Sequence, residues 1–324
     1  MLSRMKSSAQ TPSYMEETYL SLNDWLRQQF DGRRIQKLTV DAGLSCPNRD
    51  GSISTGGCIF CNDTGSGSGA FSKGVSIIDQ ILPAKKHLTR RYKAHEFLIY
   101  FQSYSNTHAP VEHLRKIYEE ALAVPDVVGL SIGTRPDCVD EEKIALLAEL
   151  AQHHMIWVEY GLQSANDETL QRICRGHDTK TFQQAVALTQ HRGIYICAHV
   201  ILGLPGETYE DMMRTARFIA HNGIHGIKLH FLYVIRNTPL ASLHEQNQYT
   251  CLTLDEYAEL ACDFLELQPP DMVIQRLSSL PHEEELIAPL WALDKNAPAK
   301  AIQAIFKKRG TRQGSRFKKE MSTP

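Results

Sequence analysis

Short apolar runs alternate with helix-like stretches along most of the chain. Runs rich in β-branched and aromatic residues, which are typical of buried strands, lie at 37–40, 97–102, 127–132, 156–161, 195–202 and 226–233. Helical spacing of apolar residues lies between them, at 111–123, 141–153, 181–192 and 209–222. This alternation predicts a parallel sheet with helical crossovers, and six repeats favour a partial (β/α)6 TIM-like barrel over a complete eightfold one. Residues 76–92 fit a helix less well because Pro83 lies among them.

The turns that follow these strands are polar and rich in glycine and proline. After the first strand comes a loop that contains cysteines, and the later tips are QSYSNTHAP (102–110), GTRPDC (133–138), EYGLQS (159–164) and GLPGET (203–208). Each alone is typical of an ordinary turn or helix cap. In a parallel barrel all of them lie at the carboxyl ends of the strands, so together they predict the rim of a ligand-binding site.

Three of the eight cysteines lie close together. Cys46, Cys58 and Cys61 fall within sixteen residues, and the other five are isolated, as expected of small buried apolar residues. A structural zinc needs four ligands, yet no fourth cysteine and no histidine lies between residues 41 and 75. Three thiolates leave one iron of a [4Fe–4S] cluster without a protein ligand, which indicates a catalytic cluster. A zinc site completed by a remote histidine is the alternative.

A glycine- and serine-rich run, GSGSG at 65–69, follows the last of these cysteines. It comes after no predicted strand and has no Gly-Lys-Ser/Thr ending, so it does not match a phosphate-binding loop. We interpret it as a flap over the metal site.

Composition adds little until the position of the charges is considered. The 324 residues are 42% hydrophobic and 22% charged, with a net charge of −2, as in ordinary globular proteins. No apolar run is long enough for a membrane span and no secretory signal is recognisable, which predicts a cytoplasmic protein. Residues 306–320, however, contain seven Lys or Arg and one Glu. Such a run is typical either of contact with a polyanion such as RNA or of a solvated terminus.

Together these motifs resemble the radical S-adenosylmethionine (SAM) enzymes, specifically the group of the Elongator catalytic subunit. The resemblance runs from about residue 36 to 314, and its most specific elements match a compact bacterial subfamily. They are the long spacing Cys46…Cys58-x2-Cys61 within CPNRDG (46–51) and GGC-x-FC (56–61), then TRPD (134–137), Glu159-x-Gly161-x-Gln163-Ser164, RGH (175–177) and NTPL (237–240), where Asn replaces a Gly.

The resemblance implies two cofactors and a reaction type. Cys46, Cys58 and Cys61 would hold a [4Fe–4S] cluster, and SAM would chelate the fourth iron through its amino and carboxylate groups. Reduction by a donor such as flavodoxin or ferredoxin would cleave SAM to methionine and a 5′-deoxyadenosyl radical. That radical would abstract hydrogen from the substrate.

The resemblance also implies contacts to SAM. Phe60 matches an aromatic position near the adenine, and Gly203 and Gly206 would let the backbone approach it. The Gly-Gly-Glu motif that grips the methionyl amine in many relatives reads Gln102-Ser103-Tyr104 here, which leaves Ser103 or Tyr104 as replacements. The candidates for the ribose or carboxylate of SAM are Arg135, Glu159 and Gln163.

Several of these residues have a purely structural alternative. Arg135 could pair with Asp137, and Glu159 could be an ion-pair partner within the sheet, because a buried carboxylate needs one. Lys228 and His230 share one strand face and are weaker candidates for catalysis on the substrate side.

The resemblance implies modification of a wobble uridine in tRNA, with the basic run 306–320 as a phosphate contact. A radical SAM enzyme acting on a small, tetrapyrrole-like molecule is one alternative, and a non-catalytic zinc- and RNA-binding protein is another. We expect an N-terminal extension or helix (1–30), a radical SAM core barrel (31–240), a helical C-terminal extension (241–305) and a basic tail (306–324).

Overall fold

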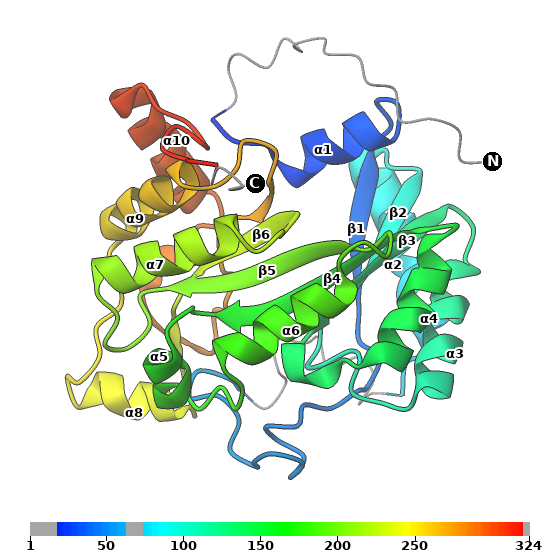
Figure 1. The fold of residues 1–324 in the computed structure, drawn as a ribbon, viewed down its shortest axis with the longest axis horizontal. Helices are drawn as coiled ribbons and strands as arrows, with labels where there is room; N and C mark the ends of the chain where they lie inside the picture. Colours follow the sequence, from blue (N-terminus) through cyan, green and yellow to red (C-terminus); the bar gives the residue numbers. More distant parts are fainter. Residues whose placement is uncertain (1–17, 63–73, 320–324) are drawn as a thin grey trace, which may run out of the picture.

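The computed structural model describes residues 18–62 and 74–319 and contains one curved, parallel sheet (Figure 1). Its strand order is β1-β2-β3-β4-β5-β6-β8, and every neighbouring pair is parallel. The strands are β1 (Ile35–Val40), β2 (Glu96–Phe101), β3 (Val127–Thr134), β4 (Met155–Gln163), β5 (Tyr195–Leu202), β6 (Gly226–Phe231) and β8 (Val273–Arg276). The predicted partial barrel is confirmed. The flap predicted at 65–69 lies outside the described residues.

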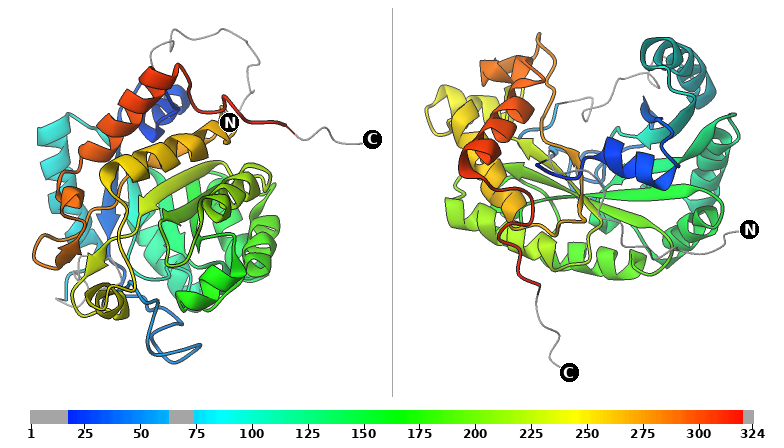
Figure 2. Two further views of the ribbon diagram at one scale, coloured as in Figure 1. Left: turned by 90° about the vertical axis from the view of Figure 1, so that its left-hand side faces the viewer. Right: turned by 90° about the horizontal axis from the view of Figure 1, so that it is seen from above.

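Helices cover the outer face of this sheet (Figure 2). They are α2 (Ile77–Tyr92), α3 (Val111–Leu122), α4 (Glu141–Ala151), α6 (Thr179–Thr189) and α7 (Tyr209–Ala220). The side chains that point outward from the strands pack against these helices in the largest apolar core, which includes Phe97, Ile132 and Val158. The short helix α5 (Asp167–Arg172) lies at the carboxyl ends of the strands, where Leu170 packs in a separate apolar cluster with Ile59. Helix α2 continues through Pro83, which is exposed, so the expected weakness at this proline does not interrupt the helix.

The part beyond β6 combines helices with short strands. It contains α8 (Pro239–Glu245), α9 (Leu254–Glu266) and α10 (Ala297–Arg309), but also β8 and a small antiparallel pair, β7 (Val234–Ile235) with β9 (Leu286–Ala288). Strand β8 extends the main sheet to seven strands. The helical C-terminal part is confirmed, and the segment 241–305 also contains the short strands β8 and β9. The sequence did not reveal β8, because a four-residue strand carries too short a pattern to be recognised. No helix in the described parts of the chain has both the length and the apolar content needed to cross a membrane.

Residues 306–319 are packed against the protein. Phe306 is fully buried, and Arg309 pairs with Asp263 (2.8 Å) and Glu266 (3.3 Å) of α9. The backbone N–H of Gln313 donates to the carbonyl of Thr18. The interpretation of this run as a solvated terminus is therefore wrong for the residues that the structure describes.

The inward-facing side chains of the strands form layers along the barrel axis. The layer at the amino ends is aromatic: Trp157 stacks on Tyr195, and Trp25 of α1 (Leu22–Gln29) meets both rings edge-on. The next layer is polar and centres on Glu159. Inward-facing residues are two apart along each strand. Strand β4 therefore contributes Trp157 to the aromatic layer and Glu159 to the polar layer above it. The carboxyl ends of the strands, above this layer, are open to ligands.

Candidate active site

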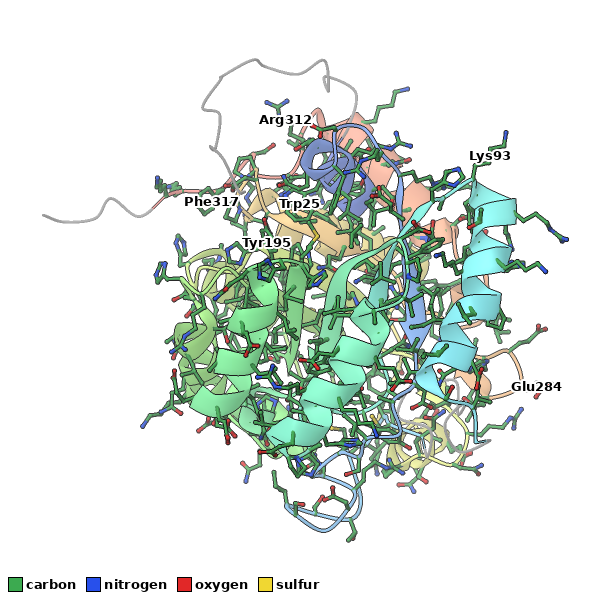
Figure 3. The ribbon with its side chains drawn as sticks, turned by 90° about the vertical axis from the view of Figure 1, so that its right-hand side faces the viewer. Trp25, Lys93, Tyr195, Glu284, Arg312 and Phe317 are labelled. Atoms are coloured by element: carbon green, nitrogen blue, oxygen red, sulfur yellow. The ribbon has the colours of Figure 1, made fainter. Side chains whose placement is uncertain are left out.

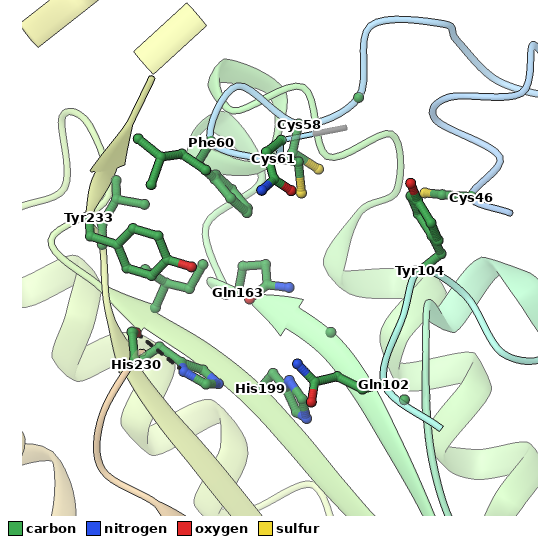
Figure 4. A pocket seen from close by; sticks show the side chains of 18 of the residues that line it. Cys46, Cys58, Phe60, Cys61, Gln102, Tyr104, Gln163, His199, His230 and Tyr233 are labelled. Atoms are coloured by element: carbon green, nitrogen blue, oxygen red, sulfur yellow. Dashed lines mark hydrogen bonds between the residues drawn. The ribbon is translucent and has the colours of Figure 1, made fainter. Parts of the chain in front are cut away.

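A cavity of about 270 Å³ lies at the carboxyl ends of the strands (Figure 4). The three clustered cysteines lie on its wall, with His199 and His230 across from them. Cavities at this end of a barrel are the usual place for chemistry in such folds. The predicted site residues that line the cavity are Cys46, Cys58, Phe60, Cys61, Tyr104, Arg135, Glu159, Gln163 and His230.

The cysteine loop is held by contacts to distant segments. Asn48, which is buried, donates from Nδ2 to the carbonyls of Cys174 (2.8 Å) and Arg175 (3.0 Å). The N–H of Ile59 donates to the carbonyl of Ile173, and the carbonyl of Ile59 accepts from the N–H of Leu240. A loop with so little apolar content cannot order itself by burial, and these hydrogen bonds provide the missing constraint.

Arginine side chains surround the thiols. Arg175 donates from Nη1 to Sγ of Cys58 at 3.6 Å and from Nη2 to the carbonyl of Gly161 at 2.7 Å. A hydrogen bond from Cys61, and then the charges of Arg175 and Arg135, hold the pKa of the Cys58 thiol well below its ordinary value. A lowered pKa favours the thiolate, which is the form that binds metal. The site is thus prepared for a metal centre of negative charge.

Arg135 is placed by two interactions. It pairs with Asp137 through two hydrogen bonds (2.8 and 2.6 Å) and donates to the carbonyl of Arg175 at 2.8 Å. The structural alternative for Arg135 is thus present in the structure. Because Arg135 also lines the cavity, the same pair orients it toward a ligand.

The arrangement of the thiols distinguishes a cluster from a zinc ion. Sulfur ligands of one tetrahedral zinc lie about 3.8 Å apart, since each Zn–S bond is about 2.3 Å. The Sγ atoms of Cys46, Cys58 and Cys61 do not all lie within 4.8 Å of one another, and Figure 4 shows Cys46 apart from the other two. Cys58 and Cys61 are close enough to hydrogen-bond, whereas Cys46 stands apart from both. Three thiols with an arginine beside them are the donor set of a [4Fe–4S] cluster that has one iron without a protein ligand, so the residues present fit that cluster.

The polar layer beneath the cavity is organised by Glu159. Its carboxylate accepts from Lys37 (2.7 Å), His199 (2.7 Å), Lys228 and Ser131. Burial alone would raise the pKa of this carboxyl, but the charges of Lys228 and Lys37 and the hydrogen bond from His199 outweigh burial and hold the pKa well below its ordinary value. Glu159 is therefore ionised. The structural alternative for Glu159, an ion-pair partner within the sheet, is present, although Glu159 also reaches the cavity wall.

Glu159, Cys197 and His199 also bring three potential metal-ligand atoms together. We do not interpret this group as a metal site. The carboxylate already has two ammonium partners, and burial raises the pKa of the Cys197 thiol far above its ordinary value. A neutral thiol is a poor metal ligand.

Four predicted residues are not among those that line the cavity. Ser103 is buried beside it, and Lys228 lies behind Glu159. The space beside Gly203 and Gly206 is filled by protein: a Cβ on Gly203 would lie 2.8 Å from Leu252, and one on Gly206 would meet Arg172. Their positive φ values (+80° and +77°) explain the glycines through the shape of the turn.

Sequence reasoning missed several residues of the cavity and its floor. Three come from the interiors of strands, namely Lys37, Tyr100 and His199, and the fourth, Arg276, ends the short strand β8. The alternation of side chains between the two faces of a strand could have identified them. It places Glu159 and Gln163 on one face of β4 and His199 on the matching face of β5. A polar residue within an otherwise apolar strand was the feature to follow.

Comparison with known families agrees with this geometry. A model of the Radical SAM superfamily matches residues 51–219, and a model of the Radical_SAM C-terminal domain matches residues 224–308. The chain belongs to the radical SAM superfamily. It is a radical SAM enzyme, and its cofactors are the [4Fe–4S] cluster and SAM that this superfamily uses. The non-catalytic zinc protein considered above is thereby excluded.

Several relatives match over most of the chain, among them two bacterial proteins. The "Uncharacterized protein YtqA" of Bacillus subtilis is 39% identical over 95% of this chain and 95% of its own length. "Protein YhcC" of Escherichia coli K12 is 39% identical over 80% of this chain and 83% of its own length.

Other relatives match more distantly. The "tRNA uridine(34) acetyltransferase" of Dehalococcoides mccartyi is 28% identical over 46% of this chain and 33% of its own length. The archaeal Elp3 structure from Methanocaldococcus infernus superposes with a TM-score of 0.63 at 17% identity, covering 86% of this chain and 64% of that one. At this identity the superposition shows a shared fold.

We expect Glu159→Gln to destabilise the protein by about 3 kcal/mol, since it leaves the buried ammonium group of Lys228 and the half-buried one of Lys37 without a carboxylate. Chemical denaturation measures the loss. Adding Lys228→Met to Glu159→Gln should recover part of it, because one of the two uncompensated charges is then gone. A double variant less stable than Glu159→Gln would contradict this description of the layer.

We expect Gly161→Ala to impair cluster assembly. Its Cβ would lie 2.6 Å from Nη2 of Arg175, which would push the guanidinium away from Cys58. After anaerobic reconstitution, iron per protein should fall clearly below that of the wild type. Gly56→Ala is the matched control, because nothing lies within 4 Å of the new Cβ there. Equal iron content in Gly161→Ala and the wild type would show that Arg175 is not needed in this position.

Proposed function

We propose that this radical SAM enzyme modifies a wobble uridine in tRNA. The observation that carries the proposal is a cavity that joins the three cysteines to a deep polar floor on an Elp3-like fold. In this superfamily the cluster and SAM together supply the one-electron chemistry needed to remove a hydrogen atom from an unreactive position.

In this proposal the residues of the chain bind, orient and exclude water. Arg175 balances the negative charge of the thiolates, and Phe60 and Gln163 provide an apolar face and an amide on the cavity wall. The aromatic layer around Trp157, which is fully buried, closes the amino end of the barrel to solvent. A dry, preorganised cavity of this kind favours reactive chemistry over side reactions with water.

The choice of tRNA rests on relatives. One match over nearly half of the chain is named a tRNA uridine(34) acetyltransferase, and three further matches are Elongator complex protein 3 sequences. The extension of this substrate to the present chain is the proposed step. A small-molecule substrate is the other outcome that the first experiment below distinguishes.

The basic run 306–320 supports contact with RNA, and its position relative to the cavity limits how an RNA could bind. Its exposed cations without an ion pair to the described residues are Lys307, Lys308, Arg312, Lys318 and Lys319. Phe317 stacks on His221, which caps α7 just before β6 begins, so the run lies at the amino ends of the strands (Figure 3). The cavity is at the other end, about 20 Å away along six strand residues. An RNA bound to both would have to pass along the side of the barrel.

The first experiment compares tRNA nucleosides by mass spectrometry between cells with and without the gene, grown anaerobically. We expect one modified wobble uridine to disappear and to return with the wild-type gene or with Cys174→Ala, whose side chain is exposed. Cys58→Ala should not restore it, because a cluster ligand is missing.

Experiments on the purified protein test the radical SAM chemistry separately from the choice of tRNA as the substrate. The wild type and Cys174→Ala should hold about four irons and cleave SAM when reduced, and Cys58→Ala should do neither. Unchanged wobble uridines together with intact cleavage of SAM would reject tRNA and leave a radical SAM enzyme that acts on another substrate.

We expect Lys307→Gln with Lys308→Gln to weaken tRNA binding and to reduce its dependence on salt, by about one unit of slope for each lysine–phosphate pair that the substitutions remove. Binding measured across a salt series tests this. The control is Lys116→Gln with Lys180→Gln, which removes two exposed charges elsewhere. Equal slopes for the two pairs would show that the basic run does not contact RNA.

A further inference from the structure

Arg276, the last residue of β8, is a cation on the cavity wall. Its side chain makes no ion pair or hydrogen bond with the residues that the structure describes, although it is half-buried. The other arginines discussed above differ, since Arg135 holds Asp137 and Arg175 holds Cys58 and Gly161. A partly buried guanidinium without an anion favours the binding of one.

The layer beneath the cavity does not supply that anion. Lys37 and Lys228 share the single carboxylate of Glu159, so these three groups carry an excess positive charge when both lysines are protonated. Their ammonium groups also lie over the ring of Tyr100, at 4.5 and 3.9 Å from its centre, which partly stabilises them. Arg276 adds a further positive charge. Burial chiefly lowers the pKa values of Lys228, His199 and His230, and the charge of Arg276 lowers them further, which places that charge near all three.

The two histidines provide hydrogen-bonding groups beside this charge. His199 donates from Nε2 to ionised Glu159, which leaves Nδ1 of the neutral ring as an acceptor. Its ring lies 5.5 Å from that of His230, and His230 contacts Ser279 through Nδ1 at 3.4 Å. The floor of the cavity thus combines a cation that has no ion pair among the described residues with a hydrogen-bond acceptor, Nδ1 of His199, and with the polar ring of His230.

We propose that Arg276 binds an oxyanion, a carboxylate or a phosphate, on the part of the second substrate that enters the cavity. The second substrate is the molecule that reacts with SAM, so this inference rests on the proposed function. His199 and His230 would accept hydrogen bonds from N–H or O–H groups of the same molecule. Arg276 is therefore a residue that determines substrate specificity, and it binds the end of the substrate that points away from the cysteines.

The position of this group separates it from the cofactor. Figure 4 shows the cysteines on one side of the cavity and His199 and His230 on the other. SAM carries a carboxylate of its own, which is the competing source of an anion. The experiment therefore has to distinguish the SAM carboxylate from an anion on the second substrate.

The test uses the cluster-loaded protein under anaerobic conditions without reductant, so that SAM binds and is not cleaved. Inorganic phosphate and acetate are titrated calorimetrically, each with and without saturating SAM. We expect saturable binding of at least one anion in both conditions, weakened at least tenfold in Arg276→Gln. Arg276→Lys should weaken binding less, because it keeps the positive charge and loses only the bidentate hydrogen bonding of the guanidinium. Arg192→Gln, a surface arginine paired with Glu141, should bind as the wild type does.

Two results would overturn the proposal. Failure of the wild type to bind either anion saturably would show that there is no oxyanion site. Loss of anion binding when SAM is present, with equal weakening of SAM binding in Arg276→Gln, would assign Arg276 to the cofactor. Cleavage of SAM by the same wild-type preparation, measured after adding reductant, tests the radical chemistry separately, so the two failures can be told apart.

A measurement on the wild-type chain covers the case in which Arg276→Gln does not fold. Phenylglyoxal modifies accessible arginines, and the modified positions are identified by peptide mass mapping. Saturating phosphate should slow the modification of Arg276 at least threefold and leave that of Arg192 unchanged. Equal rates at Arg276 with and without phosphate would contradict the proposal.

Discussion

The ionised carboxylate of Glu159 is the interaction on which the barrel interior depends. It lies on the central strand of the sheet and joins side chains from β1, β3, β5 and β6 through Lys37, Ser131, His199 and Lys228. Lys37 also donates to Gln275 of β8 at 3.0 Å, so the same network spans the gap between the two edge strands. An open barrel has no ladder of hydrogen bonds across that gap, and the hydrogen bond from Lys37 to Gln275 crosses it instead.

The cysteine loop depends on the barrel in turn. Asn48 bonds to the carbonyls of Cys174 and Arg175, and Arg175 donates to both Cys58 and Gly161. The glycine at 161 is required because a Cβ there would occupy the space of the guanidinium. Metal ligands, their counter-charge and the strand beneath them therefore form one unit, and such supporting contacts orient the ligands of metal sites in general.

Charge is divided between the two ends of the molecule. The exposed cations of residues 307–319 lie where the strands begin, whereas the cavity opens where they end. Arg309 and Arg316 do not contribute to a free basic surface, because they pair with Asp263 and Glu266 of α9. A near-neutral net charge thus conceals an exposed basic surface at one end and a partly buried positive cavity at the other.

The sequence by itself determined the parallel barrel and the family, and it nominated Cys46, Cys58 and Cys61 as the cluster ligands, because apolar periodicity and cysteine spacing are local patterns. Only the tertiary structure decided which polar residues meet. Arg135 and Glu159 combine their structural partners with a place on the cavity wall, while Gly203 and Gly206 serve a turn packed against other side chains. Strand β8, and with it Arg276, was missed because four residues carry no readable period. The physical reason is that burial and charge compensation arise between strands that are far apart in sequence, and no local pattern records them.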